Sequence, residues 1–322
     1  MENKIYNIHE NDEWVEPLRN ELNDLKVDFE EWHLGKRNID HLDKPPQGVF
    51  YNRMSASSHT RGHRYAPEYT AVVLNWLEKN ERRVINNSKA LSLEISKSLQ
   101  YKELESLGIK TPKTIYCHNK ESIIKSANMF KKPFITKHNR AGKGLGVKLF
   151  NNKKELDSYV SSKDFEASID GITLLQEYID AKPKIITRVE FVNSKFLYAV
   201  EVDASEGFEL CPACLDESED VPETQFFGEH CPTIGNKFRI IKNFNQNEII
   251  KKYEKFIQIN GIEIAGIEYI KDKDGIIYTY DVNTNTNYNS QAEKKSEIKG
   301  MKSIAEFLKK ELLAASNIKV VA

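Results

Sequence analysis

The sequence has few cysteines, no long apolar run and no excess of charge of one sign, and each lack excludes a class of protein. Its 322 residues contain four cysteines, too few for a disulfide-stabilised scaffold of this length. No apolar run approaches the length of a membrane span, and the polar start lacks the apolar core of a signal peptide. The 47 basic and 48 acidic residues are spread along the chain. We therefore expect a cytoplasmic protein with reduced thiols, bound neither to nucleic acid nor to a membrane.

One cysteine pair has a spacing that occurs in metal sites. Cys211 and Cys214 are separated by two residues, and His230 and Cys231 follow further along the chain. A zinc site usually needs four ligands, and the second half lacks the spacing of the first. Because adjacent His and Cys residues rarely ligate together, we favour structural or free thiols, with zinc as the alternative.

The order of apolar segments and turn signals predicts a mixed α/β chain of two or three packed units. Strand-like and helix-like segments alternate up to about residue 86, where the strand end Val84-Ile85 runs into capping residues. We then expect one helix from Leu93 to Gly108 that contains Lys97, followed by a strand-rich remainder. An amphipathic helix with apolar positions from Ile298 to Leu312 closes the chain and is expected to cover the core.

Two carboxylates face each other across a predicted hairpin near the C-terminus. If residues 274 and 275 form a two-residue turn, Glu268 lies directly opposite Asp281, and Asn283 projects from the same face as Asp281. Like charges at such a pair repel each other, whereas a hard cation such as Mg²⁺ would bind them. The alternative is a solvated hairpin face, because a longer turn would shift the register.

A glycine-rich loop joins two further predicted strands. Within residues 138–146, Gly142, Gly144 and Gly146 can bring backbone N–H groups close to phosphates, while Lys143 supplies positive charge. The loop is not a P-loop, because Gly144 rather than Ser or Thr follows the lysine and a strand comes next. Considered alone, a flexible hairpin tip is the more common explanation of such a loop.

Four motifs occur in an order that resembles the ATP-grasp superfamily, and most closely the RimK-type α-L-glutamate ligases. They are a helix bearing Lys97, the strand 133–137 with its glycine loop, the segment Leu175-Gln-Glu-Tyr-Ile179, and the acidic hairpin ending at Asn283. The resemblance covers about residues 84–290 and fades at both ends. It implies an α/β ATP-grasp fold with a small N-terminal α/β domain at 1–86, a central lid-bearing subdomain at 87–179 and a C-terminal antiparallel-sheet subdomain at 180–322.

The resemblance also implies roles for individual side chains. The cofactors would be ATP and Mg²⁺, with Mn²⁺ as a substitute. Lys97 and Lys137 would contact ATP phosphates, and the loop with Lys143 and Gly144 would close as a lid. The adenine would bind at a hinge formed by Gln176, Glu177, Tyr178 and Ile179. The metal ligands would be Glu268, Asp281 and Asn283, the set that the hairpin register indicates independently.

A basic segment in the N-terminal unit could bind an anion. Residues 51–64 gather three arginines and two histidines beside several hydroxyls, and guanidinium groups suit carboxylates and phosphates. In RimK-like ligases an arginine after the matching strand lies near the active cleft, so Arg53 is the candidate substrate anchor. For Arg61 and Arg64, a mobile basic surface loop is the competing interpretation.

The chain departs from the family pattern around the nucleotide. Ile186 stands where an aspartate near the ribose is expected, which leaves Asp180 as a substitute. No arginine occurs in the stretch 208–212, where one is expected to meet the γ-phosphate, so Arg188 or Arg239 would supply that charge. After Asn283, the usual Pro-Gly is replaced by a run of Thr and Asn that ends at Tyr288, which reshapes the expected acceptor pocket.

The activity implied by the resemblance is that of an ATP-dependent carboxylate–amine ligase, which forms an amide or peptide bond through an acyl phosphate and releases ADP and phosphate. Arg188 and Lys137 would be its catalytic residues, acting on the transferred phosphoryl group. The substrates would be a small-molecule or peptide carboxylate and an amine, such as glutamate and an acceptor, and a homo-oligomer is compatible with the sequence. Two alternatives stay open: a non-catalytic ATP-binding regulatory module, and a ligase for a specialised metabolite.

Overall fold

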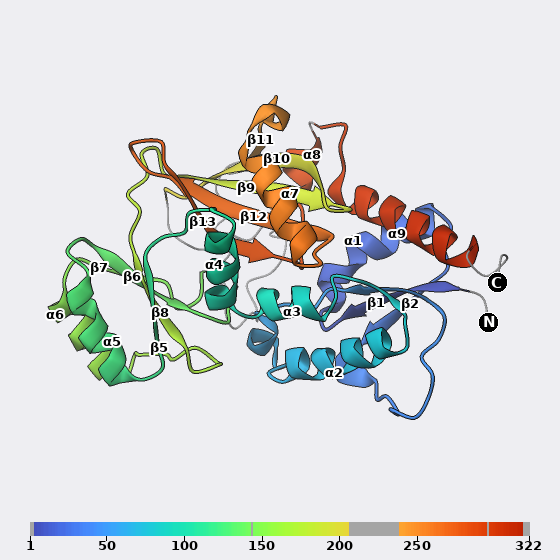
Figure 1. The fold of residues 1–322 in the computed structure, drawn as a ribbon, viewed down its shortest axis with the longest axis horizontal. Coiled ribbons are helices and arrows are strands. Elements are labelled where there is room, and N and C mark those ends of the chain that lie inside the picture. Colours follow the sequence, from blue (N-terminus) through green and yellow to red (C-terminus); the bar gives the residue numbers. More distant parts are fainter. Residues whose placement is uncertain (1–2, 143, 206–237, 295, 318–322) are drawn as a thin grey trace, which may run out of the picture.

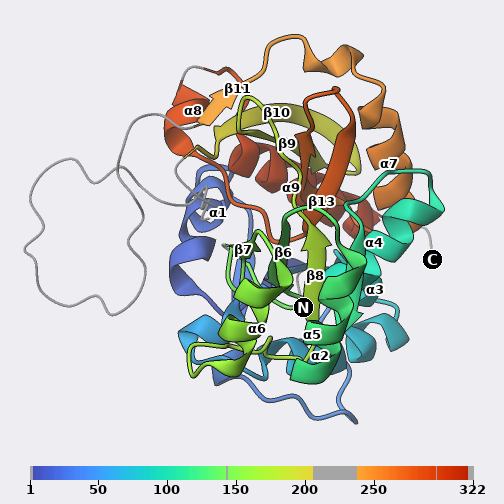
Figure 2. The same cartoon turned by 90° about the vertical axis from the view of Figure 1, so that its left-hand side faces the viewer.

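In the part of the chain that the structure describes, helices pack against three β-sheets (Figure 1). The computed structural model describes residues 3–142, 144–205, 238–294 and 296–317. The N-terminal sheet lies to one side, a small middle sheet to the other, and a five-stranded sheet joins them. Figure 2 shows the same arrangement with the middle sheet toward the viewer.

The N-terminal sheet is parallel, with the strand order β2-β1-β3-β4. Parallel neighbours need crossover connections, so helices cover both faces. On one face α2 packs over Trp32 and Phe50, and on the other α1 packs over Ile5 and Tyr51. The elements are β1 (Lys4–His9), α1 (Asp12–Asp24), β2 (Phe29–His33), η1 (Leu34–Lys36), β3 (Gly48–Asn52), η2 (Ser58–Arg61), α2 (Ala66–Lys79) and β4 (Arg83–Ile85).

The middle sheet is antiparallel, with the order β5-β8-β6-β7. Two helices cover one face and bury a cluster around Phe134, Leu156 and Leu175. The loop after β6 carries the predicted glycine-rich segment. The elements are β5 (Thr114–Cys117), α5 (Lys120–Ser126), η3 (Ala127–Met129), β6 (Phe134–His138), β7 (Lys148–Phe150), α6 (Lys153–Ser161) and β8 (Thr173–Glu177).

The five-stranded sheet is also antiparallel, with the order β11-β10-β9-β12-β13. Its largest core cluster lies between the strands and α3, α4 and α7, and includes Tyr101, Phe191 and Phe256. The elements are α3 (Ser88–Glu94), α4 (Lys97–Ser106), β9 (Ile185–Val192), β10 (Lys195–Asp203), β11 (Phe238–Ile240), η4 (Phe244–Gln246), α7 (Ile249–Ile259), β12 (Ile264–Lys271), β13 (Ile277–Asn283), α8 (Ser290–Lys294) and α9 (Gly300–Asn317).

Two expectations about helices need correction. The single helix expected from Leu93 to Gly108 is two helices, because Ser96 adopts an extended conformation and its hydroxyl caps α4 by accepting from the Leu99 N–H. Lys97 is therefore the first residue of α4. The closing helix begins only at Gly300, so Ile298 lies outside it and is 41% exposed, whereas Met301 and Ile304 are buried.

The closing helix also packs in an unexpected place. It lies along α1 and the N-terminal sheet, although it belongs to the segment that we assigned to the C-terminal subdomain (Figure 1). Its buried residues share one cluster with Ile5, Val49 and Ile264, so the N-terminal and five-stranded sheets are joined by a common apolar core. The domain boundaries at residues 86 and 179 stay predictions.

The acidic hairpin reaches the predicted pairing by a different path. Asp272 pairs with Ile276 around a three-residue turn in which Gly275 has a φ of +80°, so the expected pairing of Lys273 with Ile276 is wrong. A β-bulge at Tyr280 then adds one residue to β13 and restores the register. Glu268 lies opposite Asp281, as predicted.

Among the described residues, no helix combines the length and the apolar composition needed to cross a lipid bilayer.

Candidate active site

A cavity of about 210 Å³ lies where the three sheets meet. It has three parts, which we name for their chemistry. The hinge end is formed by Gln176–Ile179 with apolar side chains around it. The charged centre consists of Lys97, Lys137, Arg188, Glu268 and Asp281. The neutral end consists of Trp14, Ser55, Ser57, Asn285 and Asn287.

The hinge end combines a flat apolar surface with backbone polar groups. Ile135, Val147, Ile186 and Ile270 line it beside the four predicted hinge residues. Gln176 Nε2 donates to Thr114 Oγ1 at 2.9 Å, and Glu177 Oε1 accepts from the Lys113 N–H at 2.7 Å. Both side chains thus fasten β8 to the segment beside it. Such a surface suits a planar heterocycle held by backbone hydrogen bonds.

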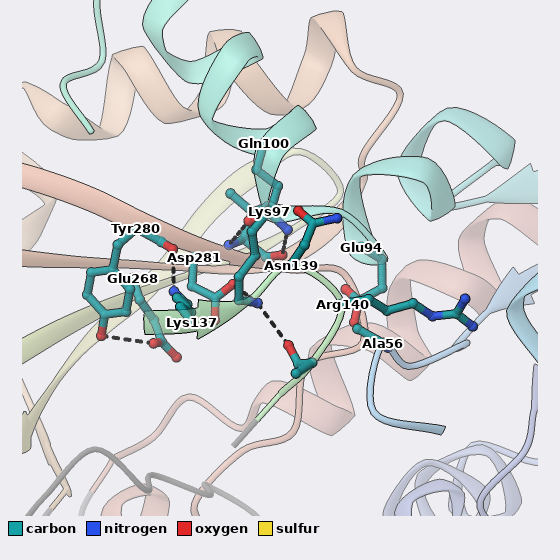
Figure 3. Close-up of polar contacts among 12 residues, drawn as sticks. Ala56, Glu94, Lys97, Gln100, Lys137, Asn139, Arg140, Glu268, Tyr280 and Asp281 are labelled. Carbon is teal, nitrogen blue, oxygen red and sulfur yellow. Dashed lines mark hydrogen bonds and ion pairs between the residues drawn. The ribbon is translucent and has the colours of Figure 1, made fainter. Parts of the chain in front are cut away.

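Two buried lysines point into the charged centre, Lys97 from the start of α4 and Lys137 from β6 (Figure 3). Lys97 Nζ donates to Asp281 Oδ1 and to the Ala141 carbonyl, both at 2.9 Å. Its helix is fixed by Asn139, which accepts from the backbone N–H of Lys97. Lys137 Nζ donates to the Tyr280 carbonyl at 3.1 Å and to the Tyr101 hydroxyl at 3.3 Å. Burial lowers the pKa of Lys137, although the nearby carboxylates favour its charged form.

The opposed carboxylates are held by cations in this structure. Arg188 Nη1 donates to Glu268 Oε1 at 2.7 Å, and the Tyr280 hydroxyl donates to Glu268 Oε2 at 3.1 Å. Burial would raise the pKa of Asp281, but Lys97 and Lys137 outweigh it, so the pKa lies below its usual value. Each carboxylate thus binds a positive side chain, Asp281 that of Lys97 and Glu268 that of Arg188, and another cation could take the place of that side chain.

The predicted metal ligands share the cavity wall. Glu268, Asp281 and Asn283 all line it. No three His, Cys, Asp or Glu side chains gather into a metal site in the part of the chain that the structure describes. The set is instead two carboxylates and one carboxamide, whose oxygens fit Mg²⁺ when substrate phosphates and water complete its shell. The residues present thus fit the predicted ion.

Arg188 is the best-satisfied cation of the site. It is buried, pairs with Glu190 and Glu268, and donates to Thr286 Oγ1 at 2.7 Å. A side chain at Gly266 would collide with its guanidinium, since a Cβ there would lie 2.4 Å from Arg188 Nη2. Burial disfavours the charged form, but the two carboxylates raise the pKa of Arg188 above its usual value. It therefore stays charged.

The family of the central segment follows from comparison with known proteins. Residues 89–209 match the model of the RimK-like ATP-grasp domain. This segment is therefore similar to a RimK-like ATP-grasp domain. No curated protein matches the chain by sequence.

Solved structures with the same architecture cover nearly the whole chain. The ATP-grasp ligase PsnB, complexed with a phosphomimetic variant of its minimal precursor, Mg and ADP, is 12% identical with a TM-score of 0.64, and the match covers 98% of this chain and 99% of PsnB. The D-cycloserine synthetase DcsG is 12% identical with a TM-score of 0.65 and coverages of 96% and 99%. The macrocyclase MdnC from Microcystis aeruginosa MRC, bound with the precursor peptide MdnA, is 12% identical with a TM-score of 0.61 and coverages of 96% and 100%. At these identities the likeness shows the fold, so the chain has the ATP-grasp fold.

The glycine loop of the ATP-grasp domain lies against the cavity. Gly142 and Gly144 line it. Gly144 and Gly146 have φ values of +77° and +72°, a region that favours glycine. At Gly146 a Cβ would also lie 2.1 Å from the His138 ring. Lys143 lies outside the described residues, as do the three cysteines and His230 of the zinc alternative.

Three predicted positions do not line the cavity. Arg239 is exposed and pairs with Glu201. Asp180 pairs with Lys182 at 3.4 Å. Arg53 is buried behind the wall of the neutral end. Its role as a substrate anchor stays a prediction, and direct contact with a ligand in the cavity would require it to move.

Arg53 is held by three groups. Its Nη2 donates to the Trp14 carbonyl at 3.1 Å and to Asn287 Oδ1 at 3.0 Å, and its Nη1 contacts Met301 Sδ at 3.7 Å. These contacts join α1, the segment after β13 and α9. Sequence reasoning placed this arginine near the cleft but could not show which way its guanidinium points.

Sequence reasoning expected the segment after Asn283 to reshape the acceptor pocket but did not assign roles to its residues. Thr284 and Thr286 are buried, and each is anchored by a buried carboxylate. Glu94 Oε2 accepts from the Thr284 N–H at 2.6 Å, and Thr286 Oγ1 donates to Glu190 Oε2 at 2.9 Å. The alternate residues Asn283, Asn285 and Asn287 line the cavity. The alternation of Thr and Asn is a period-2 signal that could have indicated this arrangement.

Proposed function

We propose that the protein is an ATP-dependent carboxylate–amine ligase that forms an amide and releases ADP and phosphate. The observation that carries the proposal is the charged centre: two buried lysines, one on α4 and one on β6, face two opposed carboxylates in one cavity. A purely structural role would not require four ionisable groups on a cavity wall, since burying charges is costly. The ATP-grasp fold supports the proposal independently.

The reaction would proceed in two steps. A carboxylate oxygen of the first substrate attacks the γ-phosphorus of ATP, the bond from that phosphorus to the bridging oxygen breaks, and ADP leaves. The amine nitrogen of the second substrate then attacks the carbonyl carbon of the acyl phosphate. The carbon–oxygen bond breaks, phosphate leaves and takes the proton lost by the amine. Phosphoryl transfer of this kind depends mainly on positioning and on neutralising charge.

Each residue of the charged centre would have its own role in this reaction. Lys97 and Lys137 bind the phosphates, and in doing so Lys97 releases Asp281. Glu268, Asp281 and Asn283 would hold Mg²⁺, or Mn²⁺ in its place, and the ion supplies positive charge beside the phosphates. Arg188 neutralises charge on the transferred group, and Glu190 keeps it oriented. The loop 138–146 closes the cavity against water.

The substrates belong to a broad class. Among the structural neighbours, PsnB is complexed with its minimal precursor and MdnC with a precursor peptide, whereas DcsG is a D-cycloserine synthetase. We therefore propose a peptide or small-molecule carboxylate and amine for this chain.

The test is ADP and phosphate release from ATP with Mg²⁺, measured across pools of amino acids and small peptides. Release stimulated by a pool establishes the ligase and names the pool, and a mass spectrum identifies the amide. Tight ATP binding without stimulated release in any pool would contradict the proposal and favour a regulatory nucleotide-binding module.

A further inference from the structure

The residues that we name the neutral end carry no ionisable side chain, unlike those of the charged centre. The carboxylate of Glu94 also lines the cavity, and both of its oxygens accept hydrogen bonds from backbone N–H groups. Oε1 accepts from the Ala56 N–H at 3.2 Å, and Oε2 accepts from the Thr284 N–H at 2.6 Å. Arg61, close to Ser57, pairs with Glu10. A free amino acid carries two opposite charges, and burying them without partners is unfavourable.

The residues of the neutral end are fixed close together by shared partners. A single nitrogen, Arg53 Nη2, donates both to the Trp14 carbonyl and to Asn287 Oδ1. Glu94 joins the loop at Ala56 to the start of the Thr and Asn run. The neutral end is therefore a built wall rather than a loose surface loop.

Arg53 determines which end of the Asn287 carboxamide meets a ligand. A guanidinium can only donate hydrogen bonds, so the oxygen of Asn287 must face Arg53. The NH₂ group of Asn287 is then left for the cavity, and none of the described residues accepts from it. Asn287 thus presents a donor whose orientation is fixed.

Asn285 supplies the complementary group. Its Oδ1 is buried and has no hydrogen-bond partner among the described residues. An unmet buried acceptor costs free energy until a donor reaches it, and the χ2 angle of asparagine is soft enough to let it turn. The cavity wall thus offers a donor at Asn287 and an acceptor at Asn285, which together match the C=O and N–H of an uncharged amide.

We propose that the neutral end binds the second substrate through an uncharged amide group, with Asn287 donating to its oxygen and Asn285 accepting from its N–H. The inference rests on the proposed function, because it assigns a substrate class to the same cavity. It favours an acceptor that carries a peptide bond or a carboxamide over an amino acid recognised by its charges alone. Arg53 acts as a positioning residue behind Asn287.

The test is calorimetric titration of three probe sets into the protein, with and without Mg²⁺ and a non-hydrolysable ATP analogue. The sets are N-acetylated, C-methylamidated tripeptides without Asn or Gln, free asparagine and glutamine, and the other free amino acids. Binding of the first set identifies a backbone amide, and binding of the second set alone identifies a side-chain carboxamide. Equal binding of the third set, or no binding of either amide set, overturns the inference.

The decisive variant is Asn287→Asp. It keeps size, shape and the oxygen that meets Arg53, but turns the cavity-facing donor into an acceptor. Amide affinity should fall about tenfold, while affinity for the ATP analogue changes less than about twofold. The control Asn119→Asp makes the same substitution at the exposed N-cap of α5. Because Asp caps a helix as well as Asn does, this variant should change neither affinity. Wild-type amide affinity in Asn287→Asp would overturn the proposal.

A double-mutant cycle separates positioning by Arg53 from its structural contacts. Arg53→Leu removes the bond to Asn287, so amide affinity should fall about threefold to tenfold. If Arg53 acts through Asn287, adding Arg53→Leu to Asn287→Asp should weaken amide binding no further. Fully additive losses would show that Arg53 acts independently of Asn287. Nucleotide titrations and ADP release in the same variants test the ligase proposal separately.

Discussion

The charged centre and the neutral end of the cavity are built on opposite principles. In the charged centre, Lys97 pairs with Asp281 and Arg188 pairs with Glu268, so ionisable side chains face the cavity directly. In the neutral end, the guanidinium of Arg53 lies behind the wall, backbone N–H groups bind both oxygens of Glu94, and the carboxamides of Asn285 and Asn287 line the cavity.

This difference explains how one cavity can bind both charged groups and neutral hydrogen-bonding groups. Paired charges must exchange partners when a ligand binds, which suits phosphates and cations that bring their own charge. Neutral carboxamides have no ion-pair partner to exchange, and they select a ligand by the direction of its hydrogen bonds. Both parts are held by the same strand, because β13 carries Asp281 and its continuation carries the asparagines.

The largest expected effect comes from removing the charge of Asp281 in the charged centre. Asp281→Asn keeps a hydrogen-bond acceptor for Lys97 but removes the negative charge that faces Lys97 and Lys137 and that would hold the proposed metal ion. We expect ADP release to fall by about a thousandfold with little change in the melting temperature. The control Asp274→Asn lies in the exposed turn of the same hairpin and should leave both unchanged. Wild-type turnover of Asp281→Asn would contradict the assigned role of this carboxylate.

The charged centre was largely predictable from the sequence because its signals are local. A strand pair, a turn and two acids are enough to bring Glu268 opposite Asp281, and the order of motifs adds Lys97 and Lys137. The prediction nevertheless depended on two errors that cancel. The turn is one residue longer than expected, and the bulge at Tyr280 compensates. A bulge has no dependable sequence signal, so the agreement at Asp281 was partly fortuitous.

The neutral end was not predictable because its construction is long-range. Arg53 meets Asn287 across 234 positions of the chain, and Glu94 meets Thr284 across 190. Sequence indicated that Arg53 follows a strand, but only packing decides whether its guanidinium enters the cavity or lies behind its wall. The same limit applies to α9: Met301, Ile304 and Leu308 are buried as expected, but Ile298 is not, and the packing against the N-terminal sheet was not foreseen.

The second effect tests whether a charged imidazole is excluded from the buried end of β1. His9, at the end of β1, is 2% exposed, and burial lowers its pKa from 6.5 to about 4. Between these values the unfolded chain binds more protons than the folded one, so stability is lost as the pH falls from 6.5 to about 4.

Replacing His9 should remove this loss of folding stability at low pH. His9→Gln should reduce the fall in unfolding free energy over this pH range by about 3 kcal/mol relative to the wild type, measured by denaturant titration. His41→Gln changes an exposed histidine and serves as the control. An identical pH dependence in His9→Gln and the wild type would show that charge is tolerated there.

A smaller effect separates the two anchors of the Thr and Asn run. Thr286 lies between Arg188 and Glu190, so Thr286→Val leaves two buried charged groups each short of one hydrogen bond. We expect a loss of about 2 kcal/mol in unfolding free energy. Thr284→Val should cost less, about 1 kcal/mol, because the backbone N–H of residue 284 still donates to Glu94. Equal losses in unfolding free energy would mean that the anchor at Arg188 and Glu190 is no stronger than the anchor at Glu94.

The smallest effect uses salt to compare the two parts of the cavity without mutation. Raising KCl from about 50 mM to about 500 mM screens charges, so the Kd of the ATP analogue should rise several-fold. The Kd of a capped tripeptide should change less than about twofold, because hydrogen bonds between neutral groups carry no net charge to screen. Both can be measured in one series of calorimetric titrations with the nucleotide present for the peptide arm. A peptide Kd that rises as steeply as the nucleotide Kd would show that the neutral end binds its substrate through charge.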